Sequence, residues 1–187
     1  MNDEAQLIEK TLAGDTAAFG QLVTRYQDRL YNTLVHIVGS TEDASDVVQD
    51  AFVQAFTKLR SFHGNAAFYT WLYRIAFNLA VSRRRRHRAT VSLDQSRDST
   101  GDEPAALARD PSDRIQQQER AQQVQCALAK LSDEHRTILV LREVDGCCYE
   151  TIGEILDLPV GTVRSRLHRA RLHLRDQLRD IFQEDVK

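Results

Sequence analysis

The sequence predicts an all-α protein made of two small helical domains joined by a flexible linker. Apolar residues recur at spacings of three and four along most of the 187 residues, whereas the alternation typical of strands is nearly absent. Only 8 glycines and 3 prolines are present, too few for a fibrous or disordered chain. Residues 89–111 lack this periodicity and hold two of the prolines, so we expect domains over residues 1–88 and 112–187 with a linker between them.

Three long helices are expected in the first domain. They should cover residues 16–38, residues 41–59, and the stretch from Asn65 into the arginine run at 83–88. Asp15 can cap the first helix, and Gly39 can end it. Ser40 or Thr41 opens the second helix, and the side chain of Asn65 is expected to cap the third.

The second domain should contain a helix-turn-helix motif. Helices are expected over residues 112–129, 132–144, 149–156 and from 161 onward. Ser132 opens the second of these, and Asp145 with Gly146 closes it. The last two helices flank a tight turn at residues 157–159, which is the layout of a helix-turn-helix.

The long helix of this motif is strongly basic over the stretch GTVRSRLHRARLHLR, residues 161–175. At 100° per residue, one narrow buried stripe is formed by Val163, Leu167, Ala170, Leu174 and Leu178. The opposite face presents donors that suit the major groove, and Arg169 could make a guanine contact worth about 1–3 kcal/mol of discrimination. A solvated cationic helix is the alternative, but few acids are interleaved to offset the arginines.

Charge and composition limit the other classes of function. The net charge is −2, but acids dominate the first fifty residues whereas residues 83–88 and 161–175 are basic. The three cysteines, Cys126, Cys147 and Cys148, lack the spacing of a zinc site, so we expect reduced packing thiols. No apolar leader or run of roughly 18 apolar residues occurs, so we expect a cytoplasmic protein without membrane insertion.

The helix over residues 41–59 carries an unusual acidic row. Its core stripe is expected to hold Val48, Ala51, Phe52, Ala55, Phe56 and Leu59. The opposite side presents Asp43, Asp46, Asp50 and Gln54, bordered by exposed Val47 and Val53. Apolar residues beside an acidic row indicate a surface that binds a basic, partly apolar protein helix. An ordinary amphipathic helix is the equally weighted alternative.

The third helix places aromatic residues ahead of arginines. Tyr69, Tyr73 and Phe77 recur at four-residue spacing and lead toward Arg84 and Arg88. Such a row suits single-stranded nucleic acid, because bases stack on rings while cations hold phosphates. The alternative is a helix covered on all sides by its neighbours. The preceding loop, RSFHGNAA, has a glycine and an amide that could accommodate a flipped base.

Three segments together resemble a known family. EDASDVVQDAFVQAF, FHGNAAFYTWLYRIAFN and YETIGEILDLPVGTVRSRLHRAR occur in this order around a linker, and the chain is similar to bacterial RNA polymerase sigma factors of the extracytoplasmic-function (ECF) group. The resemblance implies a sigma-2 domain, a sigma-4 domain and a specificity subunit that directs promoter-specific initiation. A departure is Cys148, which stands at a helix cap where Ser or Thr is usual.

The resemblance also implies partners and site residues. Core RNA polymerase would bind through its beta-prime clamp helices to Asp43, Asp46, Gln49, Asp50 and Val53, and also through its beta flap. The minus-10 strand would meet His63, Gly64, Asn65, Ala66, Tyr69, Arg74, Asn78 and Arg84, with Trp71 in the core. The minus-35 duplex would meet Thr162, Arg164, Ser165, Arg166, His168, Arg169 and Arg171. An anti-sigma factor is a further expected partner, and the free chain should be a monomer.

Two other classes of function compete with this one. A stand-alone helix-turn-helix regulator would explain the basic helix but not the acidic row or the aromatic and arginine row. An enzyme such as a nuclease would need a metal-ligand cluster, a nucleophile with its base or a glycine-rich phosphate loop, and none is evident. We therefore expect no catalytic residue, no metal site and no cofactor.

Overall fold

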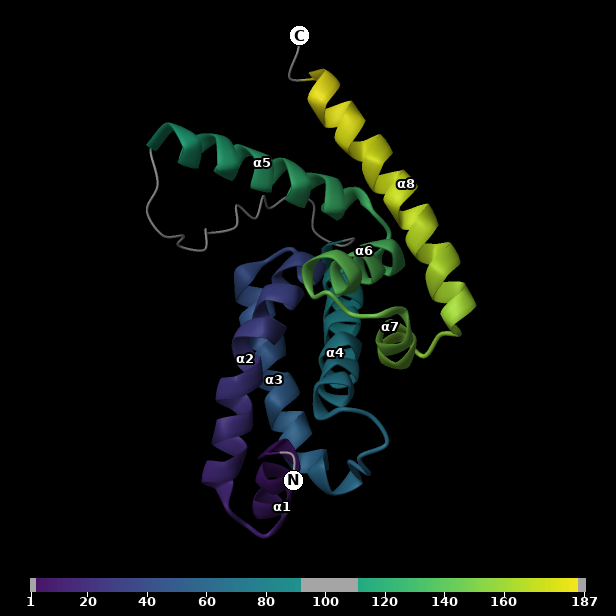
Figure 1. Ribbon diagram of the computed structural model, residues 1–187. Coiled ribbons are helices and arrows are strands. Elements are labelled where there is room, and N and C mark those ends of the chain that lie inside the picture. The colour runs from purple at the N-terminus through teal and green to yellow at the C-terminus, as the bar shows by residue number, and fades with distance from the viewer. Residues whose placement is uncertain (1–2, 92–110, 185–187) are drawn as a thin grey trace.

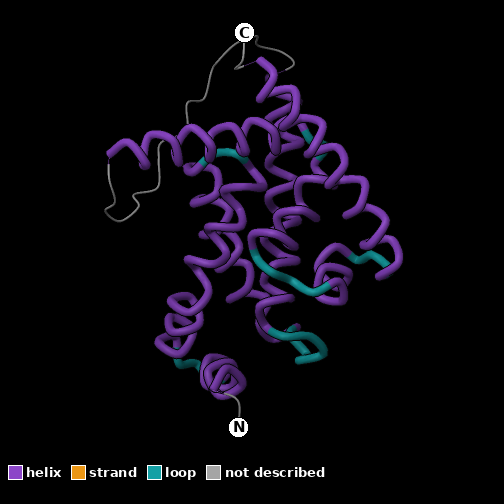
Figure 2. The backbone as a smooth tube through the Cα atoms, turned by 45° about the horizontal axis from the view of Figure 1, so that its top comes forward, coloured by secondary structure: helices purple, strands orange, loops and turns teal. Residues whose placement is uncertain are grey.

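The computed structural model describes residues 3–91 and 111–184, and all regular structure within those ranges is helical (Figures 1 and 2). The first half of the chain, residues 3–91, comprises α1 (Asp3–Leu12), α2 (Thr16–Val38), α3 (Thr41–Lys58), the short 3-10 helix η1 (Leu59–Ser61) and α4 (Phe68–Val91). The second half, residues 111–184, comprises α5 (Pro111–Lys130), α6 (Asp133–Leu139), the π-helical turn η2 (Val140–Val144), α7 (Tyr149–Leu156) and α8 (Val160–Glu184). The all-α prediction is confirmed.

Most predicted helix ends coincide with local capping interactions. The side chain of Asp15 accepts hydrogen bonds from the first-turn amides of α2, and Gly39 ends that helix at φ 82°. Ser40 caps α3. The prediction for Asn65 is wrong, because Gly64 turns the chain at φ 70° and α4 begins only at Phe68.

The first half is a bundle of α2, α3 and α4, with α1 packed across one end (Figure 1). Its most deeply buried large side chains include Leu22, Leu30, Leu34, Leu59, Phe68 and Leu72. Helix α3 is rotated relative to the prediction. Val47, predicted to be exposed, is only 1% exposed, whereas Phe56, predicted for the core, is 44% exposed. Small residues at 44, 51 and 55 share the buried stripe with Val47 and allow α3 to approach its neighbours closely.

The second half packs the helix-turn-helix against α5 and α6. Val163, Leu167 and Ala170 are buried as predicted, whereas Leu174 and Leu178 are only half-buried. The turn after α7 places Asp157 in the left-handed region at φ 54°, and the amide of Leu158 donates to the carbonyl of Gly153 at 2.9 Å. This hydrogen bond fixes the angle at which α8 leaves the turn.

The two halves touch in the structure. Helix α7 packs against α4, η2 packs against α2, and α6 also contacts α2. Figure 1 shows α5 lying across the top of the bundle and α8 descending along its side. The sequence predicts two domains joined by a flexible linker, so this contact is the main addition to the predicted architecture. The domain boundaries themselves stay a prediction.

Candidate nucleic-acid and polymerase interfaces

Helix α8 presents a polar row on the side opposite its buried stripe. Arg164, Ser165, His168 and Arg169 are all exposed, whereas Thr162 is half-buried near the start of the helix. The guanidinium of Arg164 lies 5.8 Å from the ring centre of Tyr149 on α7. Within the described ranges, neither Arg164 nor Arg169 forms an ion pair. This row is therefore available to an anionic ligand.

Acids from other helices compensate part of the positive charge on α8. Arg166 pairs with Glu134 at 3.0 Å, and Arg171 pairs with Glu143 at 2.6 Å. Our expectation that the arginines lack compensation is therefore wrong for these two. The periodicity of a single helix cannot reveal partners that come from other helices.

Cys148, which the sequence places at the start of a helix, caps α7. The Sγ atom of Cys148 accepts from the amide of Thr151 at 3.5 Å, so the predicted helix start at Tyr149 is kept with a weak cap. The thiol of Cys147 is buried, and burial together with the carboxylate of Asp145 raises its pKa to about 12. All three cysteines are free thiols, as predicted, but the expected packing role is wrong for Cys126 and Cys148, which are exposed.

A cavity of about 660 Å³ lies along α8 but away from the polar row, lined by Leu139, Leu174 and Leu178 among others. A second cavity of about 430 Å³ opens beside the loop between η1 and α4. That loop supplies His63, Gly64, Asn65 and Ala66, and α4 supplies Trp71 and Arg74. Glu154 and Asp157 complete the lining from the second half of the chain.

The predicted minus-10 residues of α4 separate into two groups. Arg74 and Asn78 are exposed, whereas Tyr69 is 8% exposed and Tyr73 is 2% exposed. The interpretation of α4 as a helix covered on both sides therefore holds for the two tyrosines. Burial raises the pKa of both phenols. Trp71 is half-buried, with ring centres 5.2 Å from Phe62 and 5.7 Å from Phe68, rather than fully in the core.

Arg84 is not a free cation in this structure. Its guanidinium pairs with Asp133 of α6 at 2.8 Å and donates to the carbonyl of Ile37 at 3.4 Å. Arg88, which the aromatic row was expected to reach, lies in a stretch whose side chains are outside the described residues.

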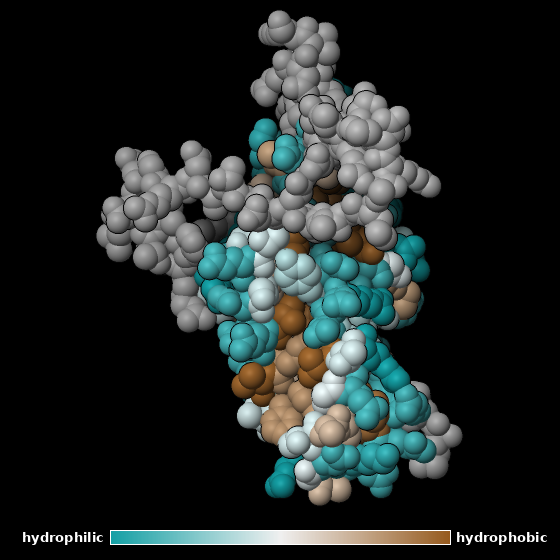
Figure 3. All heavy atoms as spheres, turned by 90° about the vertical axis from the view of Figure 1, so that its left-hand side faces the viewer, coloured by the Kyte–Doolittle hydropathy of each residue, from teal (hydrophilic) through white to brown (hydrophobic). Residues whose placement is uncertain are grey.

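The acidic row of α3 is partly occupied by a neighbouring arginine. Arg83 donates to Asp43 at 2.8 Å and to Asp46 at 2.6 Å. Gln49, Asp50 and Val53 remain exposed, and Val53 is 59% exposed. Figure 3 views the molecule from the side on which α2 lies in Figure 1, and shows an apolar band framed by hydrophilic residues. Exposed apolar residues of this kind suit a protein partner.

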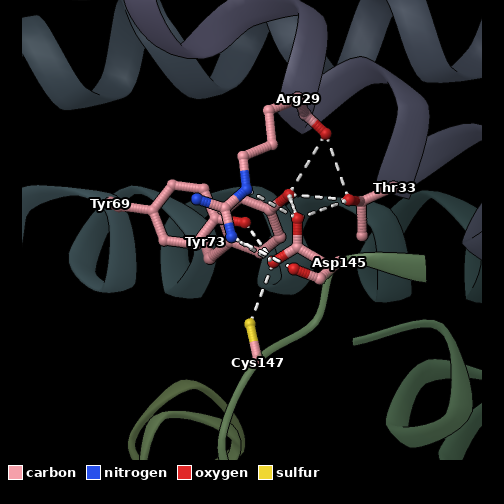
Figure 4. Close-up of polar contacts among 6 residues, drawn as sticks. All are labelled: Arg29, Thr33, Tyr69, Tyr73, Asp145 and Cys147. Carbon is pink, nitrogen blue, oxygen red and sulfur yellow. Dashed lines mark hydrogen bonds and ion pairs between the residues drawn. The ribbon is translucent and has the colours of Figure 1, made fainter. Parts of the chain in front are cut away.

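A polar cluster that we did not predict joins the two halves (Figure 4). The Asp145 cluster consists of Asp145 and five residues whose side chains lie within hydrogen-bond distance of it: Arg29, Thr33, Tyr69, Tyr73 and Cys147. The side chain of Asp145 is only 1% exposed. In the sequence, Asp145 and Gly146 indicate only the end of a helix. No sequence pattern links Asp145 to its partners on α2 and α4, which lie far earlier in the chain.

No group of His, Cys, Asp and Glu side chains within the described ranges is arranged to hold a metal ion. Among the helices of the same ranges, none has both the length and the apolar composition needed to cross a membrane.

Comparison with known proteins gives the family. The family model described as Sigma-70 region 2 matches residues 22–90, and that described as Sigma-70, region 4 matches residues 121–174. The ECF RNA polymerase sigma factor SigW of Bacillus subtilis is 37% identical over 93% of this chain and 96% of its own length. The chain belongs to the ECF RNA polymerase sigma factors. The ECF sigma-E factor of Escherichia coli K12 is 39% identical to this sigma factor over 88% of both chains.

Two solved structures resemble this sigma factor over nearly its whole length. CnrH, in complex with the cytosolic domain of CnrY, has a TM-score of 0.70 at 27% identity and covers 96% of this chain and 99% of its own. The sigma factor RpoE from Bartonella quintana, in complex with the anti-sigma factor NepR, has a TM-score of 0.70 at 26% identity over 86% of this chain and 96% of its own. The predicted family is confirmed, and a stand-alone regulator is not favoured.

Proposed function

We propose that α8 of this sigma factor reads the minus-35 duplex of the promoter. The observation that carries the proposal is the exposed row of Arg164, Ser165, His168 and Arg169, which lies opposite the buried stripe of the second helix of the motif. Arg169 supplies a bidentate donor for a guanine edge, and the hydroxyl and imidazole beside it adapt to other bases. Thr162, Arg166 and Arg171 flank this row and lie where the groove walls place phosphates.

The minus-10 strand binds at the loop between η1 and α4. His63, Gly64, Asn65 and Ala66 line one side of a cavity, and Arg74 lies at its edge. Gly64 lacks a Cβ and adopts a positive φ, so a base can approach the backbone there. Asn78 continues the same exposed side of α4, and Tyr69 and Arg84 join this surface only after their contacts with the second half are released.

Core RNA polymerase binds the exposed part of α3 through its beta-prime clamp helices. Gln49, Asp50 and Val53 combine acidity with an apolar side chain, which suits a basic helix. Asp43 and Asp46 join this surface once the partner displaces Arg83 from them. The beta flap of the polymerase binds the second half of the chain. The polymerase catalyses bond formation, so the sigma factor itself is not an enzyme. It is a monomer when free, and it acts in the cytoplasm. An anti-sigma factor that covers these surfaces is a further partner, as the complex of the Bartonella relative suggests.

Gel filtration with core polymerase tests the proposal. A sigma factor co-elutes with the core enzyme, whereas a stand-alone regulator elutes separately. Transcription of genomic fragments by the reconstituted enzyme, followed by mapping of start sites, then identifies the promoter sequence. Failure of both co-elution and specific initiation would reject the proposal.

A further inference from the structure

The carboxylate of Asp145 is a buried anion held by the opposite half of the chain. Arg29 Nε donates to Oδ1 at 2.9 Å, and its Nη2 donates to Oδ2 at 3.3 Å. The hydroxyl of Thr33 donates to Oδ1 at 3.3 Å, the hydroxyl of Tyr69 donates to Oδ2, and the hydroxyl oxygen of Tyr73 lies 3.3 Å from Oδ1. Four polar side chains from α2 and α4 therefore converge on one side chain from the second half (Figure 4). These hydrogen bonds stabilise the ionised carboxylate strongly, because hydrogen bonds to a charged group are stronger than those between neutral groups, and more so when they are buried.

The donors of the Asp145 cluster also stabilise one another. The guanidinium carbon of Arg29 lies 3.9 Å from the ring centre of Tyr69, whose ring centre is 4.2 Å from that of Tyr73. The hydroxyl of Tyr73 donates to Thr33 at 2.7 Å. The two tyrosines that were expected to face single-stranded DNA are thus covered by a loop of the second half.

A second set of contacts lies at the C-terminal end of α2. Arg136 of α6 donates to the carbonyl of Ile37 at 3.2 Å, and Gln125 of α5 hydrogen-bonds the ring of His36. The Arg84–Asp133 ion pair connects α4 to α6 in the same region. The halves are therefore joined at two separated places, and their relative orientation is defined.

This orientation places negative charge beside the loop of the first half. Glu154 and Asp157 line the cavity that also contains Asn65, Trp71 and Arg74. Both acids belong to the helix-turn-helix. Their carboxylates would repel the phosphates of a strand entering that cavity.

We infer that in the free chain the second half closes over the minus-10 face of the first half, and that Asp145 is an intramolecular latch that must open before this face can bind DNA. The closed arrangement follows from the contacts alone, whereas its effect on DNA rests on the proposed function. Gln49, Asp50 and Val53 of α3 stay exposed in the closed form. The latch thus leaves the proposed polymerase surface accessible while it hides the DNA surface, so docking can precede opening.

Trp71 is the only tryptophan of the chain, and it reports on the latch without a label. It lines the cavity with Glu154 and Asp157, so opening removes part of its cover. We would measure acrylamide quenching of Trp71 and the radius of gyration by small-angle scattering for the wild type, Asp145→Asn and Arg29→Gln. Each variant should shift the equilibrium toward the open form by roughly tenfold or more, because each removes one charge from a hydrogen-bonded pair whose carboxylate is buried.

One control variant, a second test variant and a double variant separate opening from other effects. Asp176→Asn removes an acid whose side chain is 55% exposed on α8, away from the latch, and should leave quenching and size unchanged. Arg29 is on the surface of α2, with half of its side chain exposed, so Arg29→Gln tests the latch without a buried substitution. The double variant Arg29→Gln with Asp145→Asn should open no further than the single ones, since both act on one contact.

The inference is overturned if Asp145→Asn and Arg29→Gln match the wild type and Asp176→Asn in both measurements. Co-elution of the wild-type chain with core polymerase is measured separately. A wild type that fails to co-elute rejects the proposed function, whereas the state of the latch is still decided by Trp71 and the radius of gyration.

Discussion

Asp145 shows how a single side chain can join two segments that are distant in sequence. Burial alone would raise the pKa of Asp145, but hydrogen bonds from Cys147, Tyr69 and Arg29 outweigh burial and hold the pKa below its ordinary value of 3.8. A carboxyl group with a lowered pKa stabilises the folded arrangement only while it is ionised. The charge of Asp145 therefore contributes to the stability of the closed form.

Acid should weaken the closed form. The contribution of Asp145 is complete above its ordinary pKa of 3.8 and is lost as the pH falls through its lower pKa in the closed form. Acrylamide quenching of Trp71, measured between about pH 2 and 6, should rise toward the acidic end. Asp145→Asn should lack this rise, and a rise of equal size in the variant would contradict the assignment to Asp145.

Two arginines of α8 should differ in what they contribute to promoter binding. Arg169→Ala should cost about 1–3 kcal/mol of discrimination against substituted minus-35 sequences. Arg175→Ala should weaken binding uniformly and lower the salt dependence, because this exposed side chain, paired here with Asp176, is placed to meet phosphate. Competition between promoter variants in transcription by the reconstituted enzyme measures both effects. Equal loss of selectivity and of core binding in Arg169→Ala would contradict the assignment.

Side-chain roles were predictable from the sequence only where one helix decides them. The exposed row at Arg164, Ser165, His168 and Arg169 follows from the position of the buried stripe, and the structure places these residues as expected. The burial of Tyr69 does not follow, because it depends on Asp145 from a distant segment. A helical pattern specifies which residues share a face but not what covers that face.

At the scale of elements, the turn of the helix-turn-helix depends on close approach of the backbone. A Cβ atom built on Gly153 would lie 2.7 Å from the carbonyl oxygen of Leu158, closer than real contacts allow. The amide of Leu158 in turn donates a hydrogen bond to the carbonyl of Gly153 across the turn. Gly153 is therefore required for the angle between α7 and α8, and no sequence period would have indicated this.

Gly153→Ala should destabilise the protein by about 1–3 kcal/mol, as expected for overpacking at a rigid contact. Gly161→Ala is the matched control, since nothing lies within 4 Å of a Cβ at that position in α8. The control should be neutral or stabilising, because alanine favours the helix. Urea unfolding followed by circular dichroism compares the two variants, and similar losses of stability would refute the proposed role of the contact.

Val53 on α3 gives a prediction about the polymerase surface. Val53→Asp should weaken binding to core polymerase by roughly tenfold or more, because it replaces an exposed apolar anchor by a charge. Its stability should change little, since Val53 is 59% exposed. Leu12→Asp, at an apolar residue of α1 that is 43% exposed, serves as the control and should bind normally. Affinity is measured by titration of labelled core enzyme.

Element ends were more predictable than element rotation. Asp15, Ser40 and Ser132 mark helix starts in the sequence and cap helices in the structure, because capping is a local interaction. The rotation of α3 differs, because Val47 and Phe56 are both apolar and only the packing of alanines against α2 and α4 decides which is buried. The π-helical turn η2 was likewise not foreseen within the predicted helix over residues 132–144.

At the scale of the whole molecule, the buried apolar residues of the two halves form one continuous cluster. That cluster extends from Leu7 to Ala170. The sequence favoured two independent domains because residues 89–111 have the composition of a linker. A linker sets only an upper limit on the distance between the two halves. Whether the two halves pack together depends on complementary surfaces, and the residue periodicity of either half alone does not predict that complementarity.

One continuous core should unfold as one unit. We expect the fluorescence of Trp71, which reports the first half, to change at the same urea concentration as the helical signal of both halves. In Asp145→Asn the two transitions should separate, because the halves then melt more independently. Asp176→Asn should keep them coincident. Separate transitions in the wild type would show that the halves are energetically uncoupled.

Arg136 gives the closed form a pivot. Its guanidinium is buried and donates to the carbonyls of Leu128, Ala129 and Leu131 at the end of α5, and to that of Ile37 on α2. Three of these four acceptors belong to the same half as Arg136, so among these four hydrogen bonds the one to Ile37 crosses between the halves. The Arg84–Asp133 ion pair and the Gln125–His36 hydrogen bond lie in the same region. When the Asp145 cluster opens, the halves can therefore separate at that end first while they stay connected at the end of α2.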